Sequence, residues 1–180
     1  MMRTNFSTGQ IKESTIFVPY FLIMNISIRK GLKADLSQVL ELVKELAAFE
    51  KAPNKVSVTI DEMERDGFGT EPVFKFFVAE LEGKIVGISL YYIKYSTWEG
   101  KCVFLEDIIV TESHRKYGIG KKLFDEIVRV AKGMKAKRLE WQVLAWNELA
   151  IKFYEKVDSH FDNEWVNCKL SEKQIQEYRF

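Results

Sequence analysis

The chain has 180 residues, of which 47% are hydrophobic, and this is enough apolar surface for one domain with its own core. Its 27 lysine and arginine residues nearly balance 26 acidic residues, and a net charge of +1 gives no general attraction to nucleic acid or to a membrane surface. We therefore expect a small molecule or another protein as the partner. Two distant cysteines, Cys102 and Cys168, show no CxxC spacing and no histidine cluster accompanies them, which predicts free thiols, a cytoplasmic location and no metal site.

The most hydrophobic patch of the chain, residues 16–24, is too short to span a bilayer, which takes about 20 apolar residues. It follows a long polar stretch, contains Pro19 and lacks a small-residue cleavage site, so a signal peptide is only an alternative interpretation. The pattern of a folded domain starts directly after Met24. We therefore expect residues 1–23 to be an appended segment, from an upstream start codon for example, and residues 24–180 to form a single domain.

In chain order, alternating apolar residues predict a strand at 26–29, and apolar residues at helical spacing predict helices at 36–47 and 58–66 before a turn at 66–70. Three consecutive runs rich in aromatic and β-branched residues then predict strands at 74–81, 85–95 and 101–110. The rest of the chain predicts a helix at 118–134, a strand at 138–144, a helix at 147–156 and an edge strand at 161–170. The order βααβββαβαβ joins an antiparallel meander to a βαβ crossover, so we expect an α/β or α+β fold with one central, mixed, mostly antiparallel sheet flanked by helices.

The most informative stretch is a strand, a loop and a helix start that follow one another from 105 to 122, with the sequence RKYGIG at 115–120. A helix N-terminus offers unpaired N–H groups and a positive dipole end, and glycines let an anion approach that backbone closely. Gly118 and Gly120 therefore stand where a pyrophosphate would bind, with Arg115, Lys121 and Lys122 adding positive charge. A strand–helix turn with solvated lysines is the plain structural alternative.

Two other phosphate-binding motifs are excluded. A Walker A loop needs a glycine where Arg115 stands and a serine or threonine where Lys122 stands. A dinucleotide-binding fingerprint needs a third glycine at the position of Leu123. The loop at 115–120 is therefore not that of either nucleotide fold.

The RKYGIG segment resembles the R/Q-x-x-G-x-G/A signature of the Gcn5-related N-acetyltransferase (GNAT) superfamily, in the same strand–loop–helix context. Four further segments look like the diamine (spermidine/spermine) acetyltransferase group, in order along the chain: DGFG at 66–69, YSTWEG at 95–100, LEDIIV at 105–110 and WNELAIKFY at 146–154. Within that group, Ser96 and the FEK segment at 49–51 are more similar to the thialysine N-epsilon-acetyltransferase branch. The resemblance runs from about 26 to 154 and implies the GNAT fold, acetyl-CoA as cosubstrate and a homodimer.

The chain departs from the family pattern at two positions where glycine is common. Lys116 follows the motif arginine, and Asp158 stands four residues after Tyr154. We expect Lys116 to be tolerated if its backbone φ is negative, and the alignment beyond Tyr154 is left open.

Glu106 and Asp107 lie in an otherwise apolar predicted strand, where an ionised side chain costs several kcal/mol unless it is paired or wet. A primary ammonium with a pKa of about 10.4 leaves roughly one neutral nucleophile in 10³ at pH 7, so an amine acetyltransferase needs a nearby proton acceptor. Alternation predicts the two carboxylates on opposite faces of the sheet. The resemblance implies that Glu106 is the general base and that Asp107 binds a cationic substrate. The alternative for either is to accept a hydrogen bond from Arg29 or the backbone.

The resemblance also assigns the cofactor end of the site. Tyr154 would protonate the departing thiolate as general acid, although core packing beside Phe153 is the alternative for it. Asn147 is first of all a helix N-cap and also a cofactor contact. The backbone at 108–110 would polarise the thioester carbonyl and pair with the pantetheine amides. The implied cofactor-binding residues are Ile108, Ile109, Val110, Arg115, Lys116, Tyr117, Gly118, Ile119, Gly120, Lys121, Asn147 and Tyr154.

The acceptor pocket implied by the resemblance combines aromatic and acidic side chains, which suit a small cation. Its residues are Phe49, Glu50, Trp98, Glu106, Asp107, Trp141 and Glu164. Trp98 can equally close a turn, and Glu50 can equally be a solvated helix end. The expected reaction is direct acetylation of a small cationic amine such as thialysine, a diamine or a polyamine. The alternatives are a protein, peptide or aminoglycoside acceptor, and a non-catalytic acetyl-CoA sensor.

Overall fold

The computed structural model describes residues 25–180, which form two compact units, one ending at Trp141 and one running from Gln142 to Phe180. The predicted appended segment, residues 1–23, lies outside the described residues. Among those described, no helix is both long and apolar enough to cross a membrane.

The first unit is built on one five-stranded sheet whose spatial order follows the sequence order, β1-β2-β3-β4-β5. The first four strands pair antiparallel and β5 pairs parallel to β4, as the predicted meander and crossover require. Their bounds are Ser27–Lys30 for β1, Lys75–Leu81 for β2, Lys84–Ser96 for β3, Gly100–Val110 for β4 and Arg138–Glu140 for β5. The predicted mixed, mostly antiparallel sheet is therefore confirmed.

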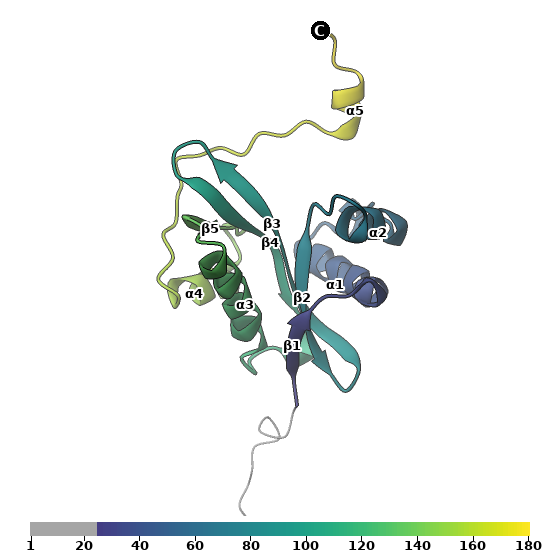
Figure 1. The fold of residues 1–180 in the computed structure, drawn as a ribbon, viewed down its shortest axis with the longest axis vertical. Helices are drawn as coiled ribbons and strands as arrows, with labels where there is room; N and C mark the ends of the chain where they lie inside the picture. Colours follow the sequence, from purple (N-terminus) through teal and green to yellow (C-terminus); the bar gives the residue numbers. More distant parts are fainter. Residues whose placement is uncertain (1–24) are drawn as a thin grey trace, which may run out of the picture. The chain divides into compact units, whose positions relative to one another are not determined.

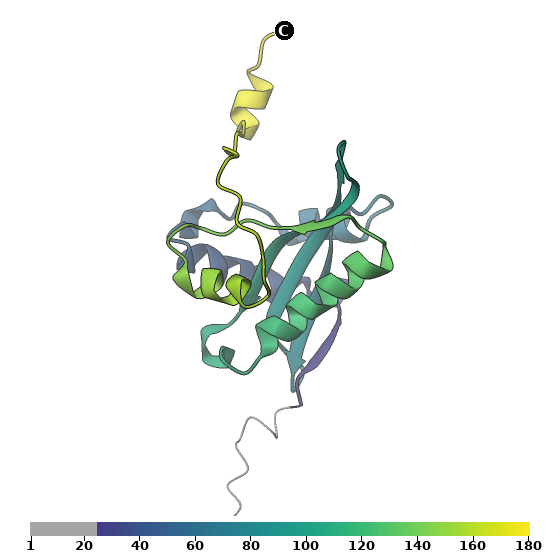
Figure 2. The same ribbon diagram turned by 90° about the vertical axis from the view of Figure 1, so that its left-hand side faces the viewer.

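Helices cover both faces of this sheet. Helices α1 (Leu36–Phe49) and α2 (Ile60–Phe68) lie on one face, and α3 (Ile119–Gly133) lies on the other, running across the strands (Figures 1 and 2). The α1 face holds a buried cluster that includes Val39, Val78, Ile88 and Ile109. On the α3 side the predicted apolar stripe is buried at Ile119, Leu123 and Ile127. From Gly87 onward, even-numbered residues of β3 such as Ile88 thus face α1, and odd-numbered residues such as Ser89 face α3.

Helix α2 begins later and ends later than its sequence pattern suggested. Thr59 caps it, because the Glu62 N–H donates to its hydroxyl and the Glu62 carboxylate accepts from the Thr59 N–H. The helix then continues through Gly67, which was predicted as part of a turn. A glycine in an exposed helix costs about 1 kcal/mol relative to alanine. Phe68, the last residue of the helix, packs edge-to-face on Phe76.

The pairing of β3 with β4 shifts by one residue in the middle of the strands. Leu90 pairs with Asp107 and Tyr91 pairs with Leu105, so Glu106 has no partner on β3. One extra residue on one strand is a β-bulge, which locally redirects side chains. The bulge divides β4 into an outer half near the hairpin tip and an inner half that leads into α3.

The other edge of β4 is paired only in its outer half. Strand β5 pairs with Cys102, Val103 and Phe104 and then ends at Glu140, shorter than the predicted 138–144. Among the described residues no strand lies along this edge from Leu105 to Val110. The sheet is therefore open beside the inner half of β4.

The second unit contains α4 (Glu148–Glu155) and the short helix α5 (Glu172–Gln176), which was not predicted. The edge strand expected at 161–170 is absent, and these residues are almost all exposed. Alternating apolar and polar residues indicate that a segment has two different faces. A strand also needs a neighbouring strand edge to pair with, and the second unit contains no such edge. That prediction was wrong.

Candidate functional site

The loop at 115–120 ends at a helix N-terminus that no side chain caps. Gly118 is the N-cap of α3, with φ of 76°, and the first helical bond runs from the Lys122 N–H to its carbonyl. The N–H groups of Ile119, Gly120 and Lys121 therefore have no partner within the helix. A Cβ on Gly118 would meet no atom within 4 Å, so the space beside this turn is open. The arrangement suits an anion, and anion binding at this turn stays a prediction.

Two charged side chains near this turn, Lys121 and Arg115, interact with other protein groups. Lys121 Nζ pairs with Asp125 at 2.5 Å on the next turn of α3. Arg115 points back to the protein: its Nε donates to the Val110 carbonyl at 2.9 Å, and its guanidinium lies over the Phe49 ring at 5.2 Å. Arg115 thus fastens the loop to β4 and to the end of α1. The anion would be held chiefly by the backbone of the turn.

Lys116 has a φ of 70°, in the left-handed region. The condition under which lysine would be tolerated here, a negative φ, is therefore not met. Left-handed backbone costs a residue with a Cβ about 1 to 2 kcal/mol, which explains why glycine suits this position better. Asp158, the other departure from the pattern, also has a positive φ, of 57°. Both positions therefore keep a glycine-like backbone without the glycine.

The open edge of β4 presents backbone donors. The Thr111 N–H donates to the Val86 carbonyl of β3, and along a strand the polar groups of successive residues point to alternate edges. The N–H groups of Val110 and Ile108 therefore point away from β3, toward the edge that β5 leaves unpaired. That of Ile109 points to β3, and its side chain is 4% exposed in the α1 core. Of the three predicted residues, Ile108 and Val110 thus present backbone N–H donors at the unpaired edge, and Ile109 packs in the core.

The bulge brings the two predicted carboxylates together. Asp107 pairs with Leu90 and so faces α1. Tyr92 lies on the same face, and burial together with the nearby carboxylate of Glu106 raises the pKa of its hydroxyl. The prediction that alternation would place Glu106 and Asp107 on opposite faces was wrong, because the extra residue cancels one step of the alternation. Tyr92 was not among the predicted site residues. Its even spacing from Leu90 indicates only that the two residues share a face of β3, and its proximity to Glu106 depends on the register of β3 with β4.

Asp107 is the most perturbed carboxylate of this group. Burial, the nearby charge of Glu106 and the charge of Glu50 together raise its pKa to about 6. Burial also raises the pKa of Glu50, at the end of α1. The predicted alternative, a hydrogen bond from Arg29 to Asp107, is not formed, because the Arg29 guanidinium pairs with the carboxylates of Asp35 and Glu80. Three carboxylates thus converge, and among residues 25–180 no cation pairs with Asp107, so the local field favours a positive ligand.

Two tryptophans predicted for the acceptor pocket lie elsewhere in the first unit. Trp141 follows β5 and packs edge-to-face on Phe124 of α3, at 5.4 Å between ring centroids. Trp98 lies at the tip of the β3–β4 hairpin and is 84% exposed. Six residues of strand separate its hairpin turn at Gly100 from Glu106, about 20 Å along the sheet. Within one chain the structure therefore does not bring Trp98 to Glu106.

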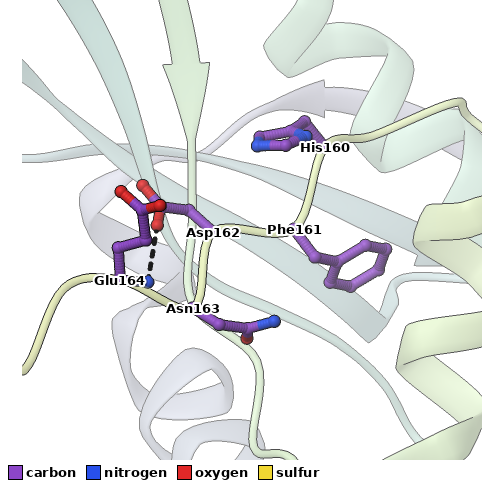
Figure 3. A pocket seen from close by; sticks show the side chains of 5 residues that line it. All are labelled: His160, Phe161, Asp162, Asn163 and Glu164. Atoms are coloured by element: carbon purple, nitrogen blue, oxygen red, sulfur yellow. Dashed lines mark hydrogen bonds between the residues drawn. The ribbon is translucent and has the colours of Figure 1, made fainter.

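The second unit contains the remaining predicted residues. Asn147 caps α4 by accepting from the Ala150 N–H at 3.2 Å, which confirms its structural role. Tyr154 lies on the same helix and is 4% exposed. Glu164 lies in the loop after α4, where residues 160–164 line a small hollow and its N–H donates to Asp162 (Figure 3). The roles of Tyr154 and Glu164 in catalysis and binding stay predictions.

The two cysteines behave as predicted. Cys102 is fully buried in β4 and Cys168 is exposed, and both are free thiols.

Comparison with known proteins gives consistent matches. Residues 40–158 match the family model described as Acetyltransferase (GNAT) family. Thialysine N-epsilon-acetyltransferase of Bos taurus is 36% identical over 138 residues, which are 72% of this chain and 81% of that protein. Spermidine/spermine N(1)-acetyltransferase-like protein 1 of Homo sapiens is 34% identical over 134 residues, 71% of this chain and 19% of its own length.

Solved structures show the same fold at low sequence identity. An integron cassette protein from V. cholerae superimposes with a TM-score of 0.70 and 19% identity, over 86% of this chain and 97% of that one. The aminoglycoside N-acetyltransferase AAC(6')-Iy in complex with CoA superimposes with a TM-score of 0.66 and 20% identity, over 82% of this chain and 95% of its own.

Proposed function

Because this chain belongs to the acetyltransferase (GNAT) family, we propose that its natural acceptor is a small cationic primary amine, such as thialysine, a diamine or a polyamine. The chain is an N-acetyltransferase, and acetyl-CoA is its acetyl donor. The observation that supports the acceptor class is the bulge at Glu106. It sets two adjacent carboxylates on one face of the sheet, beside Glu50 and next to the open edge of β4.

The residues of the first unit fit acetyl-CoA. The uncapped start of α3 and the open space at Gly118 suit the pyrophosphate, and the free-edge N–H groups of Ile108 and Val110 suit amide carbonyls laid along β4 like an added strand. When bound, acetyl-CoA supplies the acetyl group as a thioester. The backbone donors of β4 would then polarise the carbonyl that accepts negative charge, as in an oxyanion hole. No covalent enzyme intermediate is required.

Proton removal falls to the paired carboxylates. The acceptor arrives as an ammonium, and its proton must leave before the nitrogen can attack. We assign proton acceptance to Glu106, directly or through a water, because its carboxylate is exposed at the bulge. Asp107, deeper and more crowded by negative charge, would bind the cation and gain from its charge. Binding an ammonium would lower the pKa of Asp107 from about 6 and keep it ionised at neutral pH.

The assignments in the second unit come from the sequence pattern around WNELAIKFY. Tyr154 would protonate the leaving thiolate, Asn147 would contact the cofactor as well as cap α4, and Glu164 would bind the acceptor amine. Two structural observations support these assignments: Asn147 caps α4, and Tyr154 lies on the same helix.

We propose a cytoplasmic homodimer as the working form. Trp98 and Tyr95 at the hairpin tip are 84% and 75% exposed, which is much apolar surface for a single chain to leave in water. A second copy covering this tip would give Trp98 a role that it cannot have beside the Glu106 of its own chain. Two free thiols agree with a reducing compartment.

The test is a panel of acceptors with purified protein and acetyl-CoA: thialysine, diamines of three to five carbons, spermidine, an aminoglycoside and a lysine peptide. We expect turnover of at least one small aliphatic amine at a kcat/KM at least tenfold above that for the peptide and the aminoglycoside. The Glu106→Gln variant serves as the matched blank. Turnover of the peptide alone would refute the proposed acceptor class, and acetyl-CoA binding without any turnover would indicate a sensor.

A further inference from the structure

The outer half of the face that holds Glu106 contains a second group of charges, on the other side of Tyr92. Lys94 of β3 pairs with Glu140 of β5, and Arg138 Nε lies 2.6 Å from the other oxygen of that carboxylate. Arg138 also pairs with Glu99 at 3.0 Å. This charged group lies beyond the reach of the proposed proton transfer, so the reaction itself does not explain it.

Strand alternation places Lys94 on the same face as the acidic site. Lys94 is two residues from Tyr92 and four from Leu90, the partner of Asp107, so all three face the α1 side. Its ammonium lies 5.6 Å from the centre of the Phe104 ring, which is stacked on Tyr92. The charge of Glu140 reaches Tyr92 as well, since it contributes to the raised pKa of that hydroxyl. Glu106, Tyr92 and Lys94 thus form one continuous strip along the sheet.

The strip has a gradient of charge. At the bulge, the carboxylates of Glu50, Glu106 and Asp107 converge, while the outer end has two cations that share the carboxylate of Glu140. An ammonium has three N–H donors, and the side chain of Lys94 is 46% exposed. Lys94 therefore keeps donor capacity toward solvent after its bond to Glu140. Arg138 is further committed to Glu99 and is the weaker candidate.

We infer that Lys94 binds the carboxylate of an amino-acid acceptor whose terminal amine lies at Glu106, and that it thereby favours ω-amino acids over the diamines that lack this carboxylate. The inference rests on the proposed function and refines its acceptor class. The four residue steps along β3 from Leu90, the partner of Asp107, to Lys94 span about 13 Å. The extended acceptor and the flexible lysine side chain bridge that length together, since a lysine stem can lean along the sheet. A diamine has no group that gains from Lys94.

Matched acceptors isolate the carboxylate. L-lysine and 1,5-diaminopentane differ only in that group, as do L-ornithine and 1,4-diaminobutane. Steady-state kinetics would be measured for both pairs with the wild type, Lys94→Gln and the control Lys101→Gln. Lys101 lies on the same hairpin but pairs with Tyr95, which faces the α3 side, so its substitution removes equal charge from the opposite face.

We expect Lys94→Gln to raise the KM for the amino acids about tenfold, the effect of losing one charge-assisted hydrogen bond, while the KM for the diamines changes less than twofold. Lys101→Gln should change neither. Equal effects of Lys94→Gln on both members of a pair, or no effect on either, would overturn the inference while leaving the proposed function intact. So would a wild type that acetylates the diamines but not the amino acids. A wild type that acetylates no small amine overturns the proposed function and this inference with it. A thermal unfolding midpoint for Lys94→Gln within a few degrees of wild type shows that the KM change is local.

Discussion

Glu106 and Asp107, adjacent in sequence, present their carboxylates on the same face of the sheet because β4 bulges between Leu105 and Asp107. Two like charges so close cannot both be comfortably ionised without a cation, and burial of Asp107 adds to the cost. The two carboxylates therefore repel each other at the place where a cationic substrate would bind, and binding of the cation would reduce this repulsion. This relationship yields the first two predictions.

Glu106→Gln and Asp107→Asn should affect different kinetic parameters. Removing the proposed base should lower kcat about 10² to 10⁴-fold with a small change in the acceptor KM. Removing Asp107 should chiefly raise the acceptor KM, because the lost interaction is ground-state attraction to the ammonium. Steady-state kinetics on the best acceptor, with acetyl-CoA saturating, separates the two. The opposite pattern would exchange the roles of the two carboxylates.

Asp107→Asn should stabilise the protein at neutral pH. The pKa of Asp107 is raised from 3.8 to about 6, so the folded state holds a proton that the unfolded state releases between these values. The folded chain therefore loses stability as pH rises from about 4 through 6, by about 2 to 3 kcal/mol in all. Asparagine cannot ionise and escapes this loss. Urea unfolding should show the variant more stable than wild type at pH 8 and equal to it at pH 4. A constant difference across this range would contradict the electrostatic origin.

The two glycines of the anion loop should respond in opposite ways to alanine. Gly118 has a φ of 76°, so Gly118→Ala should cost about 1 to 2 kcal/mol of stability and raise the KM for acetyl-CoA by tilting the first N–H groups of α3. Gly120 lies inside the helix, and a Cβ there would meet only Val110 Cγ2, at 3.8 Å. Gly120→Ala should therefore add about 0.5 to 1 kcal/mol and leave the KM for acetyl-CoA within a few fold. Denaturant unfolding and acetyl-CoA titrations measure both effects. A stabilised Gly118→Ala would refute the role of the left-handed turn.

Local patterns predicted the framework of the first unit and not its bulge. The apolar stripe of α3 and the aromatic runs of β2, β3 and β4 repeat over many residues, so each position supports the same element and the same pairing. The bulge depends on one unpaired residue, Glu106, and no repeating pattern marks it. An argument from alternation alone therefore assigned its neighbour Asp107 to the wrong face.

The prediction of a strand at residues 161–170 failed for a different reason. Residues 161–170 alternate as a strand should, but alternation describes a segment's own faces and not the availability of an edge. Parts of the candidate site could be predicted where the residue type alone determines the role. Examples are Gly118 at the start of α3 and Asn147 as the cap of α4. Tyr92 and Lys94 were missed because their contribution depends on which face of β3 they share with Glu106, and that requires the register.

Lys116→Gly should stabilise the fold, because Lys116 holds a left-handed backbone, with φ of 70°, in an exposed loop. Relief of about 1 to 2 kcal/mol of strain is partly offset by the extra freedom of glycine in the unfolded chain, so a net gain of about 0.5 to 1 kcal/mol is expected. Asp158→Gly, at φ of 57°, should gain less, since aspartate tolerates this conformation better than lysine. Lys132→Gly, in the last turn of α3, provides the control of opposite sign and should cost up to about 1 kcal/mol. Urea unfolding at pH 7 ranks the three. If Lys116→Gly destabilises as much as Lys132→Gly, then the backbone at 116 is not strained in solution, and the lysine is held there by contacts that glycine cannot replace.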